Sequence, residues 1–436
     1  MNISKLKYKN FVGNASLFFA LVIAFWIPSY RWVLSDFIVG WLLFSVLELN
    51  FRKRFRQNLK INYVRILFAL QLVLFLLVLS NLFFAEDLNK VLKNILQKLS
   101  LFIFPLLFAL SGTKFKNKKD LFLKLFVLSN LLMSISCIAV AIYYSLNFTN
   151  GNWVFIPHDI NHFSYFRNSD LSVFHHRSYF SMYIVFSIAI LFYFNEKLKF
   201  FEGKSKKTIF WFLLLFFMVM VFLLSSRAGM LSLFILFSVQ IIRKIYFLKN
   251  IYYKILTVTI ISLMIVFVFR NERINKTVNR ILLFENKKQD NKPIKAPARI
   301  YLWKASTELI KENFLGGIGT EQFQSVFNKK YSEISGRDIN DVTKQSLNAH
   351  NQFLEEFVLY GIFGFLILLS LFVYPIFISF KRKNYLFLSF LLISGFNFLF
   401  ESMLNTIAGI VFFAFFFNYF IFVFNEEDKK VILSDI

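Results

Sequence analysis

The chain has 436 residues, of which 57% are hydrophobic and only 17% are charged, and its formal net charge is +25. Soluble domains average about 25% charged residues, so this composition excludes an ordinary soluble protein and indicates an integral membrane protein. The single cysteine, Cys137, excludes an intrachain disulfide. The excess of Lys and Arg could indicate nucleic-acid binding or membrane topology, and its distribution along the chain decides between the two.

Apolar runs long enough to cross a bilayer recur from one end of the chain to the other. A helix needs about 17–25 apolar residues to span some 30 Å of hydrocarbon. The pattern predicts about twelve spans, at residues 11–27, 32–49, 63–84, 93–111, 121–146, 176–194, 208–225, 227–243, 251–269, 351–379, 385–400 and 403–424. The sequence therefore predicts an all-α, polytopic integral membrane protein.

Lysine and arginine residues gather in alternate short loops between these runs. The groups are Lys5, Lys7 and Lys9; Arg52, Lys53, Arg54 and Arg56; Lys114, Lys116, Lys118 and Lys119; Lys197, Lys199, Lys204, Lys206 and Lys207; Arg243, Lys244, Lys249 and Lys254; and Lys381, Arg382 and Lys383. By the positive-inside rule, these loops and both termini are cytoplasmic. Since no basic soluble module stands apart from the spans, the charge indicates topology and predicts no nucleic-acid partner.

The opposite face of the membrane holds the most informative polar segments. They are the loop 147–175, the turn 224–229, a loop of roughly 80 residues from Arg270 to Ala349, and the turn 401–405. This face is periplasmic or extracellular. We therefore expect three parts: about nine spans in 1–269, a large periplasmic loop in 270–349, and about three spans with a short cytoplasmic tail in 350–436.

The long loop carries an amphipathic pattern of its own. Pro297 suits a first helical turn, and the glycines of 315–319 offer a stop. Between them, apolar residues recur at near-helical spacing, namely Ile300, Trp303, Ile310 and Phe314. Thr320 could cap a second short helix, whose apolar face would comprise Phe323, Val326, Phe327 and Tyr331. Residues 332–347 are expected to be irregular, so the loop is predicted to be partly helical.

The stretch LNAHNQFLEEF (347–357) places a histidine directly before a long apolar run. If Ser346 or Asn348 caps a helix that begins near Ala349, His350 lies in its first turn at the outer aqueous boundary. The positive end of the helix dipole disfavours the imidazolium there, and a neutral histidine is a competent general base near neutral pH. The alternative is an interfacial histidine that hydrogen-bonds only lipid or loop.

Two glutamates, Glu355 and Glu356, follow His350 in the same predicted helix. They come five and six residues later and fall on other faces of the helix, so neither can easily orient the imidazole. We expect these two carboxylates to pair with other helices.

Two arginines lie on the outer side, where the positive-inside rule gives no reason for them. Arg227 lies in the tight junction LLSSRAGML, and Arg299 lies in APARIYLWKA within the long loop. A guanidinium at the membrane edge suits bidentate binding of a phosphate. The alternatives are snorkelling or helix capping for Arg227 and an ordinary loop arginine for Arg299.

Further polar residues on this side are candidates for substrate contacts. The stretch FHHRSYF opens a span, and its His176 and Arg177 could contact a diphosphate or sugar, or could serve only as interfacial anchors. Trp303 could stack on a sugar ring, although aromatic residues are common at membrane boundaries. Asn351, beside the histidine, is a further candidate contact.

The stretch HDINH has the spacing of metal ligands in His158, Asp159 and His162. The stretch lies in a flexible-looking loop, and the sequence shows no further partner that would complete a site. We therefore expect no metal site.

Three stretches together resemble a known family in order and spacing: LLSSRAGMLSL, ARIYLWKASTELIKENFLGGIGTEQF and AHNQFLEEFVLYGIFGF. They are similar to the O-antigen ligase and polymerase family, bacterial membrane glycosyltransferases that act on polyprenyl-diphosphate-linked glycans. The resemblance covers roughly residues 220–424, where FNFLFESMLNTIAGIVFFAFFF fits the last pair of helices, and the first half matches only in topology. It implies a GT-C-type fold and a periplasmic active site in the bacterial inner membrane.

The resemblance also implies roles for individual residues. Arg227 and Arg299 would engage the donor diphosphate, and His350 would activate the acceptor hydroxyl for an attack that inverts the anomeric centre. Fixed guanidinium groups can replace a metal cation, so no cofactor is expected. Many members carry a glutamate two residues before the glycine matching Gly361. Here that residue is Leu359, which puts the role of that acid in doubt unless a nearby glutamate substitutes.

The implied partners are a polyprenyl-diphosphate-linked glycan donor, membrane lipids and a glycan acceptor. The pattern ahead of AHNQF favours a ligase, whose acceptor is the lipid A core. A polymerase, which extends another lipid-linked repeat, and a protein-glycosylating relative need the same donor site. A transporter of lipid-linked oligosaccharides is the alternative from another class. Transporters commonly place charges near the midplane, whereas these candidate charges gather at helix ends on one face.

Overall fold

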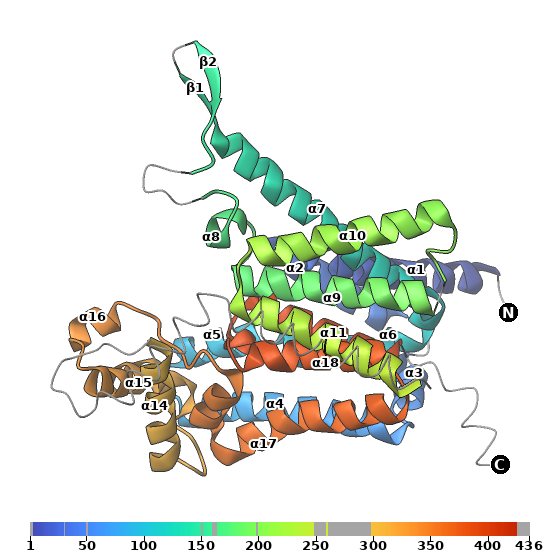
Figure 1. Ribbon diagram of the computed structural model, residues 1–436. Helices are drawn as coiled ribbons and strands as arrows, with labels where there is room; N and C mark the ends of the chain where they lie inside the picture. The colour runs from blue at the N-terminus through green and yellow to red at the C-terminus, as the bar shows by residue number, and fades with distance from the viewer. Residues whose placement is uncertain are drawn as a thin grey trace.

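The computed structural model describes residues 3–29, 31–48, 51–149, 151–158, 164–197, 199–247, 259 and 298–424. Within these ranges the chain is almost entirely α-helical, and its one β-sheet is a two-stranded hairpin. Most helices run side by side in a long bundle (Figure 1). The prediction of an all-α, multi-pass membrane protein is confirmed at this level.

The bundle is built from the apolar runs of the sequence. Its first helices are α1 (Ile3–Trp26), α2 (Arg31–Leu47), α3 (Phe51–Asn58), α4 (Asn62–Ser80), α5 (Leu88–Lys98), α6 (Ser100–Phe115) and α7 (Lys119–Ser145). After the hairpin, β1 (Leu146–Thr149) and β2 (Asn152–Phe155), come α8 (Asn168–Leu171), α9 (Arg177–Glu196), α10 (Lys204–Leu223) and α11 (Arg227–Phe247). The last bundle helices are α17 (Gln352–Lys381), α18 (Tyr385–Phe398) and α19 (Ile407–Phe422). Short 3-10 turns lie at η1 (Asn81–Phe84), η2 (Lys116–Lys118) and η4 (Met403–Asn405).

Six helices in the described part of the chain are long and apolar enough to cross a membrane, or seven if α2 and α3 form one bent span. Four further apolar helices have 10–17 residues. Every predicted span that falls in the described ranges coincides with a helix, and the span predicted at 251–269 lies outside them. Several membrane spans are therefore present, and the total of twelve stays a prediction.

Helix α9 packs against α7, α10, α11 and α18. Almost all of its side chains from Ser178 to Phe194 are buried. A helix that is apolar all round is stable only where protein or lipid covers every face, and neighbouring helices cover almost all of α9. The ring of Phe186, for example, lies with its centroid 5.4 Å from that of Phe390 and 5.0 Å from that of Phe416. This packing fixes the position of the polar residues at the start of α9.

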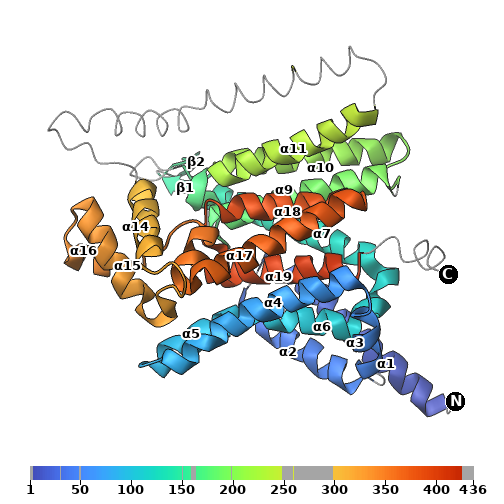
Figure 2. The same ribbon diagram turned by 90° about the horizontal axis from the view of Figure 1, so that it is seen from below.

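A smaller helical layer covers one end of the bundle, which we call the outer end (Figures 1 and 2). It consists of α14 (Ala298–Glu312), α15 (Gly319–Ser335) and α16 (Ile339–Thr343). Both helices that the sequence predicts in this region are present, and the predicted apolar face of the second is buried at Phe323, Phe327 and Tyr331. The described part of the long loop is therefore folded onto the bundle.

Two predictions for this layer are wrong. Thr320 does not cap α15, because the helix already begins at Gly319 and the amide of Thr320 donates instead to the side-chain oxygen of Asn81 at 2.9 Å. Residues 332–347 are not irregular throughout, because α15 extends into them and the side chain of Asp338 caps α16.

The outer layer is joined to α17 by backbone hydrogen bonds at a break in that helix. Gly361 interrupts α17 with φ 65° and ψ −158°. There, the amide of Ile362 donates to the carbonyl oxygen of Phe314, and the amide of Ile318 donates to that of Val358, both at 2.9 Å. The break thus leaves backbone amides and carbonyls of α17 free to form hydrogen bonds with the segment that links α14 to α15.

No side chain fits at this junction. A Cβ on Gly361 would collide with the carbonyl of Leu315, and one on Gly317, whose φ is 69°, would collide with the carbonyl of Leu359. Glycine tolerates both the positive φ and the close approach. The two glycines therefore hold the outer layer, which carries Arg299, in a fixed position on α17.

The basic groups that fall within the described residues lie at the end of the bundle opposite the outer layer. Helix α3, the turn η2, the start of α10 and the end of α17 all reach this end, as does the start of α1 (Figure 1). The two ends of the bundle therefore differ in charge in the way that the sequence predicts.

Candidate functional site

A cavity of about 670 Å³ opens at the outer end of the bundle. Its walls come from α8, the start of α9, the turn between α10 and α11, the start of α14, and the segments before α17 and after α18. Its charged and titratable lining residues are Asp170, His176, Arg177, Arg227, Arg299, His350 and Glu401. Residues far apart in the sequence thus converge here, and three of them are arginines.

His350 lies just ahead of α17 and not in its first turn. The helix begins at Gln352, and Asn351 is its N-cap, with a side-chain oxygen that accepts two backbone N–H groups of the first turn at 3.0 and 3.2 Å. The prediction that Ser346 or Asn348 caps this helix is therefore wrong, because Asn351 takes that role.

The backbone before α17 turns the imidazole of His350 into the cavity. His350 has a φ of 45°, in the left-handed region that residues other than glycine rarely adopt. The side-chain oxygen of Asn348 accepts the amide hydrogen of His350 at 2.9 Å, which supports this turn. A strained backbone conformation is often found at functional sites.

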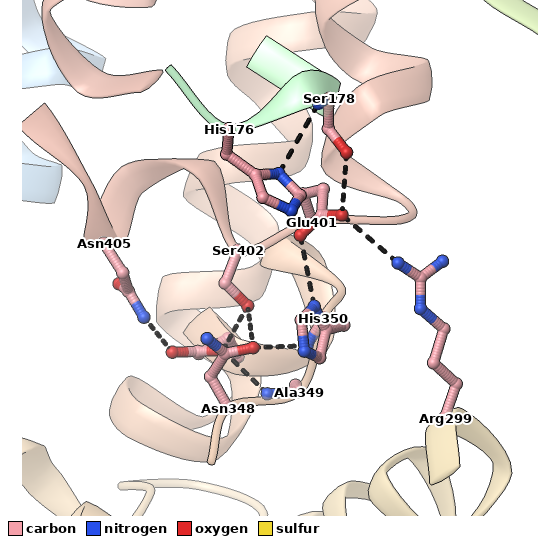
Figure 3. A network of polar contacts seen from close by, with 10 residues as sticks. His176, Ser178, Arg299, Asn348, Ala349, His350, Glu401, Ser402 and Asn405 are labelled. Carbon is pink, nitrogen blue, oxygen red and sulfur yellow. Dashed lines mark hydrogen bonds and ion pairs between the residues drawn. The ribbon is translucent and has the colours of Figure 1, made fainter. Parts of the chain in front are cut away.

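Glu401 is the centre of a polar network in the cavity (Figure 3). One carboxylate oxygen lies 3.1 Å from Nδ1 of His350. The other accepts from Arg299 Nη2 and from Ser178 Oγ, each at 3.2 Å. If Nδ1 of His350 donates its proton to the carboxylate, Nε2 carries the lone pair and can accept a proton. The pair thus has the arrangement of a general base oriented by an acid.

The environment keeps Glu401 ionised. Burial by itself would raise the pKa of this carboxyl, but the hydrogen bond from His350 and the charge of Arg299 outweigh burial, so the pKa lies below its ordinary value. The Glu401 side chain is 10% exposed, whereas those of Arg299 and His350 are 36% and 38% exposed. The carboxylate of Glu401 is therefore buried beneath the side chains of Arg299 and His350, which a substrate can reach.

Arg227 is the first residue of α11. Ser225 makes the turn from α10 with a φ of 48°, and Ser226 Oγ accepts the amide hydrogen of Gly229 at 3.2 Å. A Cβ on Gly229 would collide with Ser181 of α9, so glycine lets α11 begin close against α9. The sequence SSRAG therefore builds a tight junction that places Arg227 at the cavity.

His176 and Arg177 line the cavity at the start of α9. His176 is the N-cap, and its Nδ1 accepts the amide hydrogen of Ser178 at 3.5 Å. Burial lowers the pKa of His176 below its ordinary value, against the opposing effect of Glu401. Arg177 Nη1 donates to Asn168 Oδ1 at 3.3 Å, which ties α9 to α8. His176 is therefore biased toward the neutral form, and Arg177 contributes positive charge.

Glu355 clamps together the two segments that carry the histidine and its acid. This side chain is fully buried. It accepts the amide hydrogen of Ala349 at 2.9 Å, and it also accepts from Ser402 Oγ and Asn405 Nδ2 (Figure 3). Ala349 precedes His350 and Ser402 follows Glu401, so Glu355 fixes the separation of the catalytic candidates without contacting either.

Glu356, the next residue, pairs with a different helix. Its carboxylate lies 2.9 Å from Lys98 Nζ, and both side chains are at most 2% exposed. Gln352 donates to the same carboxylate at 2.9 Å and accepts the amide hydrogen of Leu404. Both glutamates therefore pair with other segments, as the sequence predicts, and neither touches His350 through any described contact.

Two of the candidate contacts lie outside the described cavity lining. Asn351 is engaged in capping α17, and Trp303 is half-buried on α14. In the HDINH stretch, His158 lies within the described residues, and Asp159 and His162 lie outside them.

Sequence reasoning did not single out Glu401. The one available signal is an acidic residue directly after the apolar run of α18, on the face predicted to carry the other candidates. Glu401 is 51 residues from His350 and 102 from Arg299, so spacing along the chain gave no reason to group them.

Comparison with protein families gives one match. Residues 211–369 match the family model described as O-antigen ligase. The matched region contains Arg227, Arg299 and His350, whereas His176, Arg177 and Glu401 lie outside it. No curated protein matches the chain.

Proposed function

Because residues 211–369 match the family model described as O-antigen ligase, we propose that the chain is a ligase of the bacterial inner membrane. It transfers a glycan from a polyprenyl-diphosphate carrier to a hydroxyl of the lipid A core, on the periplasmic face. The reaction inverts the anomeric centre and uses no metal. The observation that carries this proposal is the contact of 3.1 Å between His350 and Glu401 in a cavity that also holds three arginines.

The acceptor side of the reaction falls to His350. As the acceptor oxygen attacks the anomeric carbon, its proton passes to Nε2 of His350, and the Glu401 carboxylate stabilises the imidazolium that forms. Glu401 also keeps the proton of the neutral imidazole on Nδ1. The network therefore supports a general base that is ready before substrate binds.

The donor side falls to the arginines. The bond between the anomeric carbon and the diphosphate oxygen breaks, and the electron pair leaves with the polyprenyl diphosphate. Arg227, Arg177 and Arg299 surround the cavity and can stabilise the growing negative charge. Because diphosphate is already a good leaving group, this charge stabilisation replaces a strong general acid.

The distribution of charge supports the orientation that we propose. The basic groups of α3, η2 and α10 lie at the end opposite the cavity, so the positive-inside rule places that end and both termini in the cytoplasm. The cavity then faces the periplasm.

The test is transfer in vitro by the purified protein, with a polyprenyl-diphosphate glycan as donor and lipid A core as acceptor. Wild type is compared with His350→Ala, Arg227→Ala and Lys311→Ala, the last being an exposed residue of α14 outside the cavity lining. We expect transfer by wild type and Lys311→Ala, with or without a metal chelator, and loss of transfer by the two cavity variants. Thermal unfolding and gel-filtration profiles show that each variant remains folded.

The acceptor distinguishes the alternatives. Extension of the donor glycan in the absence of lipid A core identifies a polymerase that uses the same site. Movement of the donor across vesicle membranes without any transfer identifies a transporter. Undiminished transfer by His350→Ala would show that another group is the base.

A further inference from the structure

The hairpin that follows α7 has one apolar face and one polar face. Its strands pair with Leu146 opposite Phe155 and Phe148 opposite Trp153. Because side chains alternate across a strand, these four residues share one face. The other face carries Asn147, Thr149, Asn152 and Val154. The pattern is typical of a strand pair with one face shielded from water and one face exposed to it.

The apolar face is exposed in the structure. Trp153 is 70% exposed, Phe148 61%, Phe155 53% and Leu146 44%. The rings of Phe148 and Trp153 contact each other with centroids 5.3 Å apart. A two-stranded hairpin is at best marginally stable in water, so such a face needs another surface to cover it.

The surface of α7 indicates what covers this face. Helix α7 lies in a candidate span, and apolar side chains on it are exposed up to its last turn, where Tyr143 is 74% and Tyr144 57% exposed. Aromatic residues in such positions mark the membrane boundary. The hairpin continues directly from this turn and projects from the end of α7, clear of the outer layer (Figure 1). Its exposed apolar side chains thus follow directly along the chain from the exposed apolar side chains of a candidate spanning helix.

The chemistry of the hairpin favours lipid over the other occupants. No residue from Tyr143 to Pro157 is charged, so the hairpin offers no ion pair to a protein partner. A glycan would need hydrogen-bonding side chains beside the stacking rings, and here the asparagines lie on the opposite face. An uncharged face of aromatic and aliphatic side chains suits the boundary between headgroups and acyl chains.

We propose that the β1–β2 hairpin is an interfacial membrane anchor, whose apolar face inserts into the outer leaflet. The base of the hairpin is tied to the chain that follows it. The amide of Ile156 donates to the carbonyl of Ser145 at 2.7 Å, and the ring of Phe155 lies 6.1 Å from that of Phe166. Phe166 lies two residues before α8, which lines the cavity. The anchor therefore holds one wall of the cavity at the level of the lipid headgroups, where lipid-linked substrates present their polar ends.

The first test measures the depth of single nitroxide labels in lipid vesicles. Cys137 is the only cysteine and is buried, so the full chain with Cys137→Ala accepts one new cysteine without ambiguity. The labelled variants are Phe148→Cys and Trp153→Cys on the apolar face, with Asn147→Cys and Asn152→Cys as matched controls on the polar face. The vesicles contain phosphatidylethanolamine and phosphatidylglycerol, and accessibility to oxygen is compared with accessibility to a water-soluble nickel chelate.

We expect labels at 148 and 153 to be more accessible to oxygen than to nickel, and labels at 147 and 152 to show the reverse. Equal nickel accessibility at all four positions would place the hairpin in water and overturn the proposal. Immobilised labels at 148 and 153 that neither reagent reaches would also overturn it, because they would indicate contact with protein.

A second measurement needs no cysteine. Tryptophan fluorescence of wild type and Trp153→Phe is compared in vesicles whose acyl chains are brominated near the headgroup. We expect the signal contributed by Trp153 to be quenched by these lipids. A Trp153 signal insensitive to bromine would contradict membrane insertion even if the labelled variants failed to fold. Neither measurement requires glycan transfer, so the anchor can stand or fall independently of the proposed function.

Discussion

Nδ1 of His350 lies 3.1 Å from a carboxylate oxygen of Glu401, although the two residues are 51 positions apart. His350 precedes α17 and Glu401 follows α18, so the pair exists only because these antiparallel helices pack together. The carboxylate also receives Arg299 from the outer layer. One acidic side chain thus connects the proposed base to the proposed donor site.

Glu401→Gln should impair catalysis more than binding. The neutral amide cannot stabilise the imidazolium of His350, and loss of a residue that supports a general base costs about 10²–10⁴-fold in kcat. We expect a fall in kcat within this range and little change in KM for the acceptor. Glu308→Gln, on the exposed face of α14, is the matched control. A Glu401→Gln variant with wild-type kcat would remove Glu401 from the mechanism.

Acid should weaken the folded state through the same carboxyl. The pKa of Glu401 is lowered in the folded protein, so its contribution to stability is complete above the ordinary value of about 4.3 and is lost as pH falls through the folded value. Wild type should therefore unfold at a higher temperature than Glu401→Gln above about pH 5, and the gap should shrink below about pH 4. Thermal unfolding of both proteins in detergent, at a series of pH values above and below this range, measures the difference in melting temperature. A gap that does not change with pH would contradict the lowered pKa.

Arg227→Lys should retain only part of the donor kcat/KM that Arg227→Ala loses. Lysine keeps the charge but cannot bind a diphosphate through two parallel hydrogen bonds. A hydrogen bond to a charged group contributes about 1.5–3 kcal/mol, so we expect its loss in the lysine variant to lower kcat/KM for the donor by about 10-fold or more. We expect a larger fall in the alanine variant. Steady-state transfer rates at varied donor concentration measure both. Equal activity of Arg227→Lys and wild type would reduce the role of Arg227 to charge alone.

Gly361→Ala should destabilise the protein. The added methyl group would collide with the carbonyl of Leu315. The substituted residue would also have to keep a φ of 65°, in the left-handed region. Strain of this kind costs about 1–3 kcal/mol before any displacement of the outer layer. Gly316→Ala is the control, because a Cβ there meets nothing within 4 Å. Thermal unfolding of the two variants tests the junction, and equal melting temperatures would show that it does not hold the layer.

The buried pair of Lys98 and Glu356 should be costly to break from one side. Removing one partner of a buried ion pair costs about 3–5 kcal/mol, because the other charge is left without compensation. We expect Lys98→Met and Glu356→Gln each to lower the melting temperature, and the double variant to recover part of the loss. The glutamine at 356 retains an oxygen for the hydrogen bond from Gln352. Additive effects of the two substitutions would show that the charges are not coupled.

The sequence by itself determined the membrane-length helices and the charge asymmetry between the two ends of the bundle. Length and apolarity decide whether a helix can cross a membrane, and both are properties of a contiguous segment, so α4, α7, α9 and α17 follow from local composition. The helices of the outer layer followed from periodicity in the same way. The sequence also singled out Arg227 and His350, because polar residues at the ends of apolar runs are conspicuous, and Arg299, because the positive-inside rule does not account for it.

Only the tertiary structure decided how these residues meet. Glu401 could not be assigned to His350 from sequence, because its role depends on how α17 and α18 pack and not on spacing along the chain. The sequence offered Ser346 and Asn348 as caps of α17, but the backbone geometry gives this role to Asn351, which is an equally favourable cap residue. Propensity and periodicity act over a few residues, whereas the cavity is assembled from six segments whose relative positions depend on packing across the whole bundle.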